Sequence, residues 1–266
     1  MKIGFIGVGN MGSAIMKAVL TRVNAENVYI SDANANRIKH FSEKDGTVAS
    51  DNQGIAECCD YIFLGVKPQM MADMLKAISP ALKTRQGRFV LISMAAGLEI
   101  ATLREMLGEA YPIIRIMPNL PVSVGEGMTL YDSVGVEENE INTFLDFMGN
   151  TGKLVHLAEK LIDAGCSVSG CGPAFMCLMI EAMSDAGVKC GLTRTDATTL
   201  ATQTMLGTAK LLSETETHPA LLKDAVCSPG GSTIVGVEAL EDGAFRATVM
   251  DAVVSAYERN RELGKK

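Results

Sequence analysis

Residues 3–15 read IGFIGVGNMGSAI, an apolar run followed by a glycine-rich loop and then by helical spacing. The loop at 7–12 matches the pattern G-x-G-x-x-G, and a second apolar run, NVYISD at 27–32, ends at Asp32 about 20 residues further along. The glycines alone are a weak signal. Strand, glycines, helix and second strand in this order are a strong one, and they predict a dinucleotide-binding β-α-β unit.

Each glycine of this loop has a separate steric purpose in such a unit. Gly7 permits the tight turn, Gly9 lets the backbone approach a pyrophosphate, and Gly12 lets the helix pack closely on the strand. The helix offers its first N–H groups and the positive end of its dipole to the phosphates. The alternative is a turn that merely packs well. The residues expected to bind the dinucleotide here are Ile6, Gly7, Val8, Gly9, Asn10, Met11 and Gly12.

Further strand-like runs occur at 61–68, 89–97 and 111–121, with helical spacing between them. Repeated strand–helix units predict an α/β domain with a Rossmann-type, doubly wound parallel sheet and helices on both faces. Ligands bind at the carboxyl ends of the strands of such a sheet. The loops that follow these strands should therefore lie at the binding edge, although ordinary turn chemistry explains each loop taken singly.

The strand pattern stops after about residue 159 and gives way to helical spacing. Helices rich in small and apolar residues are expected at 171–189, 195–213, 232–241 and 244–263. One helical domain of this length cannot easily bury so many apolar faces, so we expect a homodimer or larger assembly formed through this half. The expected domains are a dinucleotide-binding domain at 1–160 and an all-α domain for substrate binding and dimerisation at 161–266.

The composition excludes several classes of partner. The formal net charge is −7 and there is no basic run, which gives no support for nucleic-acid or anionic-membrane binding. The N-terminus reads as a strand rather than a signal peptide, and no stretch is expected to approach the ~20 apolar residues that span a bilayer. The seven cysteines include no C-x-x-C pair, and the three histidines lack metal-ligand spacing. We therefore expect reduced thiols, a cytoplasmic location and no bound metal.

A second glycine-rich stretch, CSPGGST at 227–233, lies at or just before the start of an expected helix. Backbone N–H groups at such a turn, together with the helix dipole, accept an anion. Because the loop at 7–12 already serves the nucleotide phosphates, the anion here would be a carboxylate or phosphate of the substrate. The Thr233 hydroxyl adds a further hydrogen-bonding group. A helix cap made by an ordinary serine and threonine explains the composition equally well.

The residues around the end of the second strand leave the type of dinucleotide open. Asp32 favours NAD because its carboxylate can bind the ribose hydroxyls. Polar and basic neighbours that would instead receive the 2′-phosphate of NADP are Ser31, Asn34, Asn36 and Arg37.

Seven segments carry a family resemblance in the same order along nearly the whole chain. They are IGFIGVGNMGSAI (3–15), VKP (66–68), AAG (95–97), IMPNLP (116–121), SGCGPAF (169–175), HPALLKDAVCSPGGSTI (218–234) and GAFRATVMDAV (243–253). They resemble the pyrroline-5-carboxylate reductase family, and LKDAVCSPGGSTI is the most specific of them. Leu120 and Cys171 depart from the residues usual in that family, and the resemblance assigns no essential role to either position.

The resemblance implies the last step of proline synthesis, the reduction of L-1-pyrroline-5-carboxylate to L-proline by hydride transfer from NAD(P)H to C5 of the protonated imine. It implies that the loop at 230–233 holds the substrate carboxylate and that Thr233 acts near the ring nitrogen. The implied substrate-binding residues are Gly230, Gly231, Ser232, Thr233 and Glu159. The implied cofactor-binding residues, besides the glycine-rich loop, are Asn52, Val66, Lys67, Pro68, Ala95, Ala96 and Gly97. NADP(H) is the implied preference, with NAD(H) as the alternative, and the implied assembly is a dimer that associates further into a decamer.

Two other interpretations compete with this one. A β-hydroxyacid dehydrogenase has a similar domain order but carries a lysine on the first helix of its second domain, followed by an asparagine four positions on. The corresponding helix here, PAFMCLMIEAMSDAG at 173–187, has Glu181 and Asp185 but no lysine before Lys189. A nucleotide-binding protein without catalysis would not need the second anion loop. His218 precedes a proline and is expected to cap or pack rather than to transfer a proton.

Overall fold

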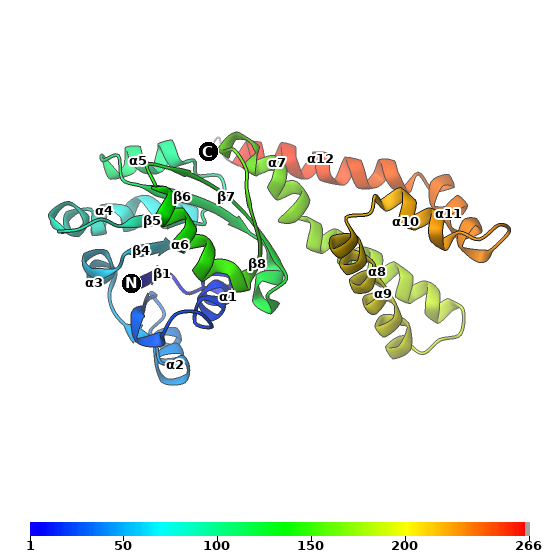
Figure 1. The fold of residues 1–266 in the computed structure, drawn as a ribbon, viewed down its shortest axis with the longest axis horizontal. Coiled ribbons are helices and arrows are strands. Elements are labelled where there is room, and N and C mark those ends of the chain that lie inside the picture. The colour runs from blue at the N-terminus through cyan, green and yellow to red at the C-terminus, as the bar shows by residue number, and fades with distance from the viewer. Residues whose placement is uncertain (264–266) are drawn as a thin grey trace. The chain divides into compact units, whose positions relative to one another are not determined.

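The computed structural model describes residues 1–263, and it describes side chains for residues 1–262. The chain divides into two compact units, one made of Met1–Gly170 together with the segment from Tyr257 on, and the other of Cys171–Ala256 (Figure 1). The first unit contains the sheet, and the second is helical.

The sheet of the first unit has eight strands within the described residues, in the order β3-β2-β1-β4-β5-β6-β7-β8. The strands are β1 Ile3–Ile6, β2 Val28–Ser31, β3 Val48–Ala49, β4 Tyr61–Leu64, β5 Val90–Ser93, β6 Ile113–Pro118, β7 Gly127–Val134 and β8 Gly152–His156. Neighbours are parallel except for β6 and β7, which are antiparallel. The doubly wound parallel sheet is therefore confirmed, and it contains one antiparallel pair, β6 and β7.

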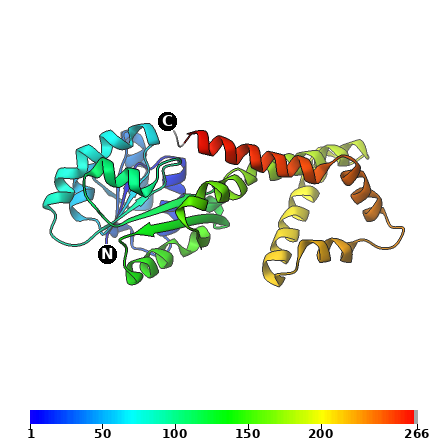
Figure 2. The same ribbon diagram turned by 90° about the horizontal axis from the view of Figure 1, so that it is seen from above.

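Helices cover both faces of this sheet (Figure 2). They are α1 Asn10–Val19, α2 Ala35–Asp45, α3 Asn52–Cys58, α4 Pro68–Thr84, α5 Ile100–Leu107, α6 Glu138–Met148 and α7 Glu159–Ser169, with short 3₁₀ turns at η1 Ala25–Asn27, η2 Leu120–Val124 and η3 Gly149–Thr151. Alternate residues of the central strands enter two separate cores. Phe5 and Phe63 stack with ring centroids 4.4 Å apart in one core, while Ile6 and Leu64 lie in the other.

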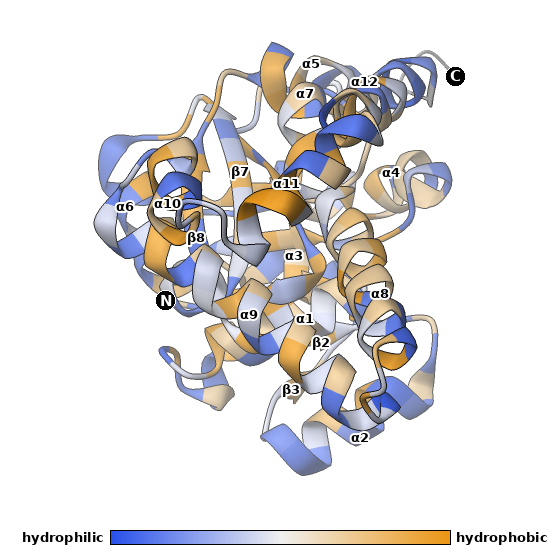
Figure 3. Ribbon diagram, turned by 90° about the vertical axis from the view of Figure 1, so that its right-hand side faces the viewer, coloured by the Kyte–Doolittle hydropathy of each residue, from blue (hydrophilic) through white to orange (hydrophobic). Residues whose placement is uncertain are grey.

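The second unit consists of helices that bury little of their own apolar surface. They are α8 Gly172–Lys189, α9 Arg194–Thr215, α10 Pro219–Val226, α11 Ser232–Asp242 and the first part of α12 Phe245–Leu263. Helices α8 and α9 pack together around Ser184, Ala197 and Ala201, the buried residues of this unit. Figure 3 shows hydrophobic residues along α8 and α11, and many of these side chains are exposed in the single chain.

One segment is long and apolar enough to cross a membrane by length and composition alone. It is Glu159–Lys189, which covers α7 and α8, and 6% of its most apolar window is buried. This corrects the expectation that no stretch approaches that length. Exposed apolar surface also marks protein interfaces, so the segment by itself does not indicate a bilayer.

The compact units divide the chain later than the expected domain boundary between residues 160 and 161. Helix α7 belongs with the sheet because Ile162 packs against Met117 and Leu130. The end of α12 belongs there as well, since Asn260 Nδ2 donates to the Asp163 carbonyl oxygen at 3.4 Å. The roles expected of the two domains remain predictions.

Candidate functional site

The glycine-rich loop between β1 and α1 shows three different steric environments. Gly7 has a φ of +96°, and a Cβ there would lie 2.7 Å from the Gly65 carbonyl oxygen. A Cβ at Gly12 would lie 2.5 Å from the Gly7 carbonyl oxygen, whereas one at Gly9 would meet nothing within 4 Å. Gly7 and Gly12 are thus required by the fold itself, and Gly9 leaves open space where a ligand can approach the backbone.

Helix α1 begins without a side-chain cap, because its N-cap residue is Gly9. Its N-terminus therefore presents backbone N–H groups and the positive end of the helix dipole toward the open loop. Of the other loop residues, Val8 is buried, Asn10 is exposed, and Met11 packs partly against the core. This arrangement fits the phosphates of a dinucleotide.

The Asp32 carboxylate is held by the protein's own main chain. Its Oδ2 accepts the Val8 N–H at 2.9 Å and its Oδ1 accepts the Asn34 N–H at 2.8 Å. Arg37 lies 3.6 Å from the same Oδ2 atom, and the Asp32 side chain is 9% exposed. One function of Asp32 is therefore to fix the glycine-rich loop against the end of β2.

A cavity of about 340 Å³ opens beside this loop and gathers residues from four strand ends. Seven residues expected at the cofactor line it: Ile6, Gly7, Gly9, Ser31, Asn52, Val66 and Lys67. Ser31 Oγ donates to Asn52 Oδ1 at 2.6 Å, which joins β2 to α3 at the cavity wall. Six further residues line it: Asp32, Ala33, Arg37, Gly65, Met70 and Met74.

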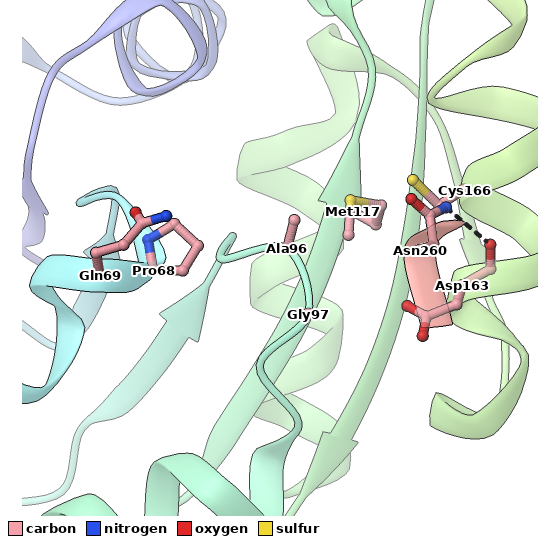
Figure 4. Close-up of a pocket in the computed structure, with 8 residues that line it drawn as sticks. All are labelled: Pro68, Gln69, Ala96, Gly97, Met117, Asp163, Cys166 and Asn260. Atoms are coloured by element: carbon pink, nitrogen blue, oxygen red, sulfur yellow. Dashed lines mark hydrogen bonds between the residues drawn. The ribbon is translucent and has the colours of Figure 1, made fainter. Parts of the chain in front are cut away.

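A second cavity, of about 190 Å³, lies in the same unit and contains three more of the expected cofactor residues, Pro68, Ala96 and Gly97. It is lined by Pro68, Gln69, Ala96, Gly97, Met117, Asp163, Cys166 and Asn260. Figure 4 shows Ala96 and Gly97 between Pro68 on one side and Asp163 with Asn260 on the other. Ala95 is buried behind this surface at 2% exposure.

The loop at 227–233 belongs to the helical unit and opens the N-terminus of α11. Gly230 has a φ of +67°, and the Gly231 N–H donates to the Ser228 carbonyl oxygen at 3.0 Å. Gly231 is the N-cap residue and supplies no side-chain cap, while Ser232 and Thr233 lie inside the first turn and are exposed. The serine and threonine are therefore not the N-cap of this helix, which weakens the helix-cap interpretation and leaves the N–H groups for an anion.

Comparison with known proteins gives a match over the whole chain. Residues 159–263 match the family described as pyrroline-5-carboxylate reductase dimerisation, and residues 2–97 match the one described as NADP oxidoreductase, coenzyme F420-dependent. A pyrroline-5-carboxylate reductase of Methanosarcina acetivorans is 39% identical over 100% of this chain and 98% of its own. This chain belongs to the pyrroline-5-carboxylate reductase family.

Solved structures of reductases agree with this assignment. The Plasmodium falciparum pyrroline carboxylate reductase with NADP bound is 35% identical, with a TM-score of 0.87 over 99% of this chain and 98% of its own. The Coxiella burnetii pyrroline-5-carboxylate reductase is 31% identical, with a TM-score of 0.92 over 98% of each chain. Membership of the reductase family favours the imine interpretation over the hydroxyacid one, and the match at 159–263 means that the chain contains a dimerisation domain.

Glu159, expected near the substrate of this reductase-family chain, lies in a network of hydrogen bonds inside the sheet unit. Its Oε1 accepts the Ile100 N–H at 2.8 Å and the Arg115 Nη1–H at 3.2 Å. Its own N–H donates to Asp132 Oδ2 at 2.6 Å. Contact between Glu159 and the substrate stays a prediction.

Three residues of these sites carried no sequence signal. Arg115 sits in the middle of an apolar strand, and Asp163 and Asn260 sit on helices far apart in sequence. Only the folded structure shows that these residues lie close together at the site. His218 caps α10, as expected, because its Nδ1 accepts the Ala220 N–H at 3.2 Å. Among the residues that the structure describes, no three His, Cys, Asp or Glu side chains gather as a metal site.

Proposed function

We propose that this protein reduces 1-pyrroline-5-carboxylate to proline with a reduced nicotinamide dinucleotide. The observation that carries the proposal is the match over the whole chain to a reductase at 39% identity. The open cradle at Gly9 and the uncapped N-terminus of α11 supply the two anion sites that such a reaction needs, one for the pyrophosphate and one for the carboxylate.

The substrate residues would bind and orient a ring that is already reactive. A protonated imine is electrophilic, so its reduction needs less help from a proton donor than the reduction of a ketone. The backbone of Gly230 and Gly231 and the first turn of α11 hold the carboxylate, so that one face of the ring meets the cofactor. The Thr233 hydroxyl orients the ring N–H, and no side chain is assigned as general acid.

The cofactor residues hold the dinucleotide along the two cavities of the sheet unit. The loop at 7–12 takes the pyrophosphate, Asn52 the ribose region, and the loops at 66–68 and 95–97 the nicotinamide side. When bound, the cofactor supplies the hydride that reaches C5 of the imine. We assign NADP(H) as the preferred form, with NAD(H) as the alternative. The Asp32 oxygens already accept two backbone N–H groups, so they are less available to bind ribose hydroxyls. The Arg37 guanidinium lines the same cavity and can bind a 2′-phosphate.

The assembly and location complete the proposal. The exposed apolar helices of 171–256 support a homodimer through the helical unit, and the family resemblance extends this to a decamer. The location that we propose is the cytoplasm, whose reducing environment suits a chain in which the described cysteines form no disulfide.

The proposal is tested by following NADPH absorbance after 1-pyrroline-5-carboxylate is added to the purified protein, with NADH in a parallel cuvette. Rapid oxidation of NADPH is expected, with a slower rate for NADH. If a protein that binds either cofactor oxidises neither in the presence of the imine, the proposed activity is wrong. Turnover of a hydroxy acid would then restore the dehydrogenase interpretation.

A further inference from the structure

The loop that lines the smaller cavity leads into helix α5, whose N-cap side chain makes no capping hydrogen bond. Residues 95–99 lie in the connection between β5 and α5 and contribute Ala96 and Gly97 to the cavity. Glu99 is the N-cap residue of α5, and its side chain makes no cap hydrogen bond. The hydrogen bond across the turn, from the Leu98 N–H to the Ala95 carbonyl oxygen, is long at 3.5 Å. The loop is therefore weakly fixed by its own sequence.

A distant carboxylate supplies the missing cap. Glu159, the first residue of α7, accepts the N–H of Ile100, the first residue of α5, at 2.8 Å. Glu159 is itself held by the bond from its N–H to Asp132 on β7. The end of the cavity loop is thus attached to the sheet through one carboxylate oxygen.

A buried arginine orients the Glu159 carboxylate. Arg115 on β6 is 2% exposed, and its two terminal nitrogens lie 3.2 Å from Glu159 Oε1 and 3.3 Å from Asp163 Oδ1. Asp163 lines the same cavity as Ala96 and Gly97. Arg115 Nε has no hydrogen-bond partner among the described residues. Replacing a buried ion pair with apolar side chains is often neutral or stabilising, so stability alone does not account for this arrangement.

We propose that Arg115 and Glu159 are positioning residues for the nicotinamide end of the cofactor. Arg115 orients Glu159, Glu159 fixes the N-terminus of α5, and the loop at 95–99 is thereby held where Ala96 and Gly97 form the cavity wall. This inference rests on the proposed function for the placement of the nicotinamide, and it assigns to Glu159 a role through the loop rather than through the substrate.

The test compares NADPH with 2′-phospho-ADP-ribose, which lacks the nicotinamide, by calorimetric titration of the full-length protein. Glu159→Ala removes the cap and is expected to weaken NADPH binding about tenfold and to lower kcat/KM about 10- to 100-fold. The same variant should bind 2′-phospho-ADP-ribose within about twofold of the wild type. Glu159→Gln should recover most of the loss, because its amide oxygen can still accept the Ile100 N–H.

A second variant removes the other partner of the same bond. Ile100→Pro deletes the N–H donor at the first helical position, which accepts proline, and leaves the buried ion pairs intact. It should reproduce the selective loss of NADPH binding even if Glu159→Ala does not fold. The matched control is Glu140→Ala, which also removes a carboxylate held by an arginine and bonded to an N–H at a helix start, but at α6. Glu140 lines neither cavity, so its loss should leave both affinities unchanged.

Three results would overturn the inference. Equal weakening of both ligands by Glu159→Ala would show a general structural role. Unchanged NADPH binding in both Glu159→Ala and Ile100→Pro would show that the loop needs no such support. A raised KM for the imine in Glu159→Gln, with NADPH binding intact, would show direct substrate contact. The binding measurements stand whether or not the protein reduces the imine, so they separate this inference from the proposed function.

Discussion

Gly7, Gly9 and Gly12 look alike in the sequence pattern, but a Cβ at each would have a different effect. Only Gly9 faces open space, whereas a Cβ at Gly7 or Gly12 would lie within 2.7 Å of a backbone oxygen. Substitution of Gly7 or Gly12 should therefore lower the stability of the fold. Substitution of Gly9 should instead lower the affinity for the ligand.

We predict that Gly9→Ala weakens NADPH binding at least tenfold, or about 1.4 kcal/mol, because the added methyl group stands where the pyrophosphate must approach. Its free energy of unfolding should fall by no more than about 1 kcal/mol, the cost of a poorer N-cap residue. Calorimetric titration and urea unfolding measure the two quantities. The control is Gly12→Ala, which should lose about 1–3 kcal/mol of stability through its 2.5 Å contact. Full affinity in Gly9→Ala would remove the loop from the cofactor site.

The loop at 230–233 carries the Thr233 hydroxyl, which is proposed to orient the ring nitrogen of the substrate. Thr233→Ala should lower kcat/KM for the imine by about tenfold or more, because the hydroxyl that orients the ring nitrogen is lost. The unfolding midpoint should not change, since Thr233 is exposed in the single chain and is not the N-cap residue of α11. Steady-state kinetics with NADPH measure the effect, and Thr233→Ser, which keeps the hydroxyl, should restore the rate. An unchanged rate in Thr233→Ala would exclude Thr233 from the mechanism.

At the scale of elements, the sheet unit shows how a surface carboxylate can stabilise a helix start. Glu140 Oε2 accepts the N–H of Glu137, the N-cap residue of α6, at 2.8 Å, and both of its oxygens bond to Arg88. The Arg88 guanidinium holds the pKa of Glu140 below its usual range, although partial burial opposes this. The Glu140 side chain is 13% exposed, so solvent screens this bond less than it would at an open surface.

We predict that Glu140→Gln lowers the free energy of unfolding at neutral pH by about 1–2 kcal/mol, because solvent at the exposed Arg88 side chain reduces the ~1.5–3 kcal/mol of a hydrogen bond to a charged group. Because the folded pKa is depressed, this stability is fully present above the unfolded pKa of about 4.3 and is lost as the pH falls through the folded value. Urea unfolding of wild type and variant should therefore differ at pH 7 and converge in acid. Glu138→Gln, an exposed position on the same turn, is the control. A difference that persists in acid would contradict the assignment to the charge of Glu140.

The sequence predicted the strands that are buried on both faces, because such strands are continuous apolar runs. Strands β1, β4, β5 and β6 are buried throughout, and each appeared as an apolar run. Strands β7 and β8 were missed, because GMTLYDSV and GKLVH mix polar and apolar residues near an edge of the sheet. The glycine-rich site came from local spacing. The network of Arg115, Glu159 and Ile100 could not be predicted, because it joins three elements that only the topology brings together.

At the scale of the whole molecule, the helical unit lacks the apolar burial that would stabilise it alone. Helices α10 and α11 bury no residue in the single chain, whereas the central strands of the sheet unit are buried throughout. Large apolar side chains such as Leu178, Val235 and Met250 are more than 60% exposed. Apolar exposure on this scale indicates a surface that a second chain covers, in the same region that matches a dimerisation family.

We predict that the protein is a dimer or a multiple of one, and that its melting temperature rises with protein concentration, since association stabilises only the folded chain. Val235→Glu and Leu178→Glu each place a charge among apolar side chains and should weaken association by about tenfold or more. Light scattering after size exclusion measures the mass. Val124→Glu is the matched control, because this residue is 74% exposed but lies on η2 of the sheet unit. A wild-type protein that stays monomeric at every concentration would require its exposed helices to be covered by a different partner, and the homodimer would be wrong.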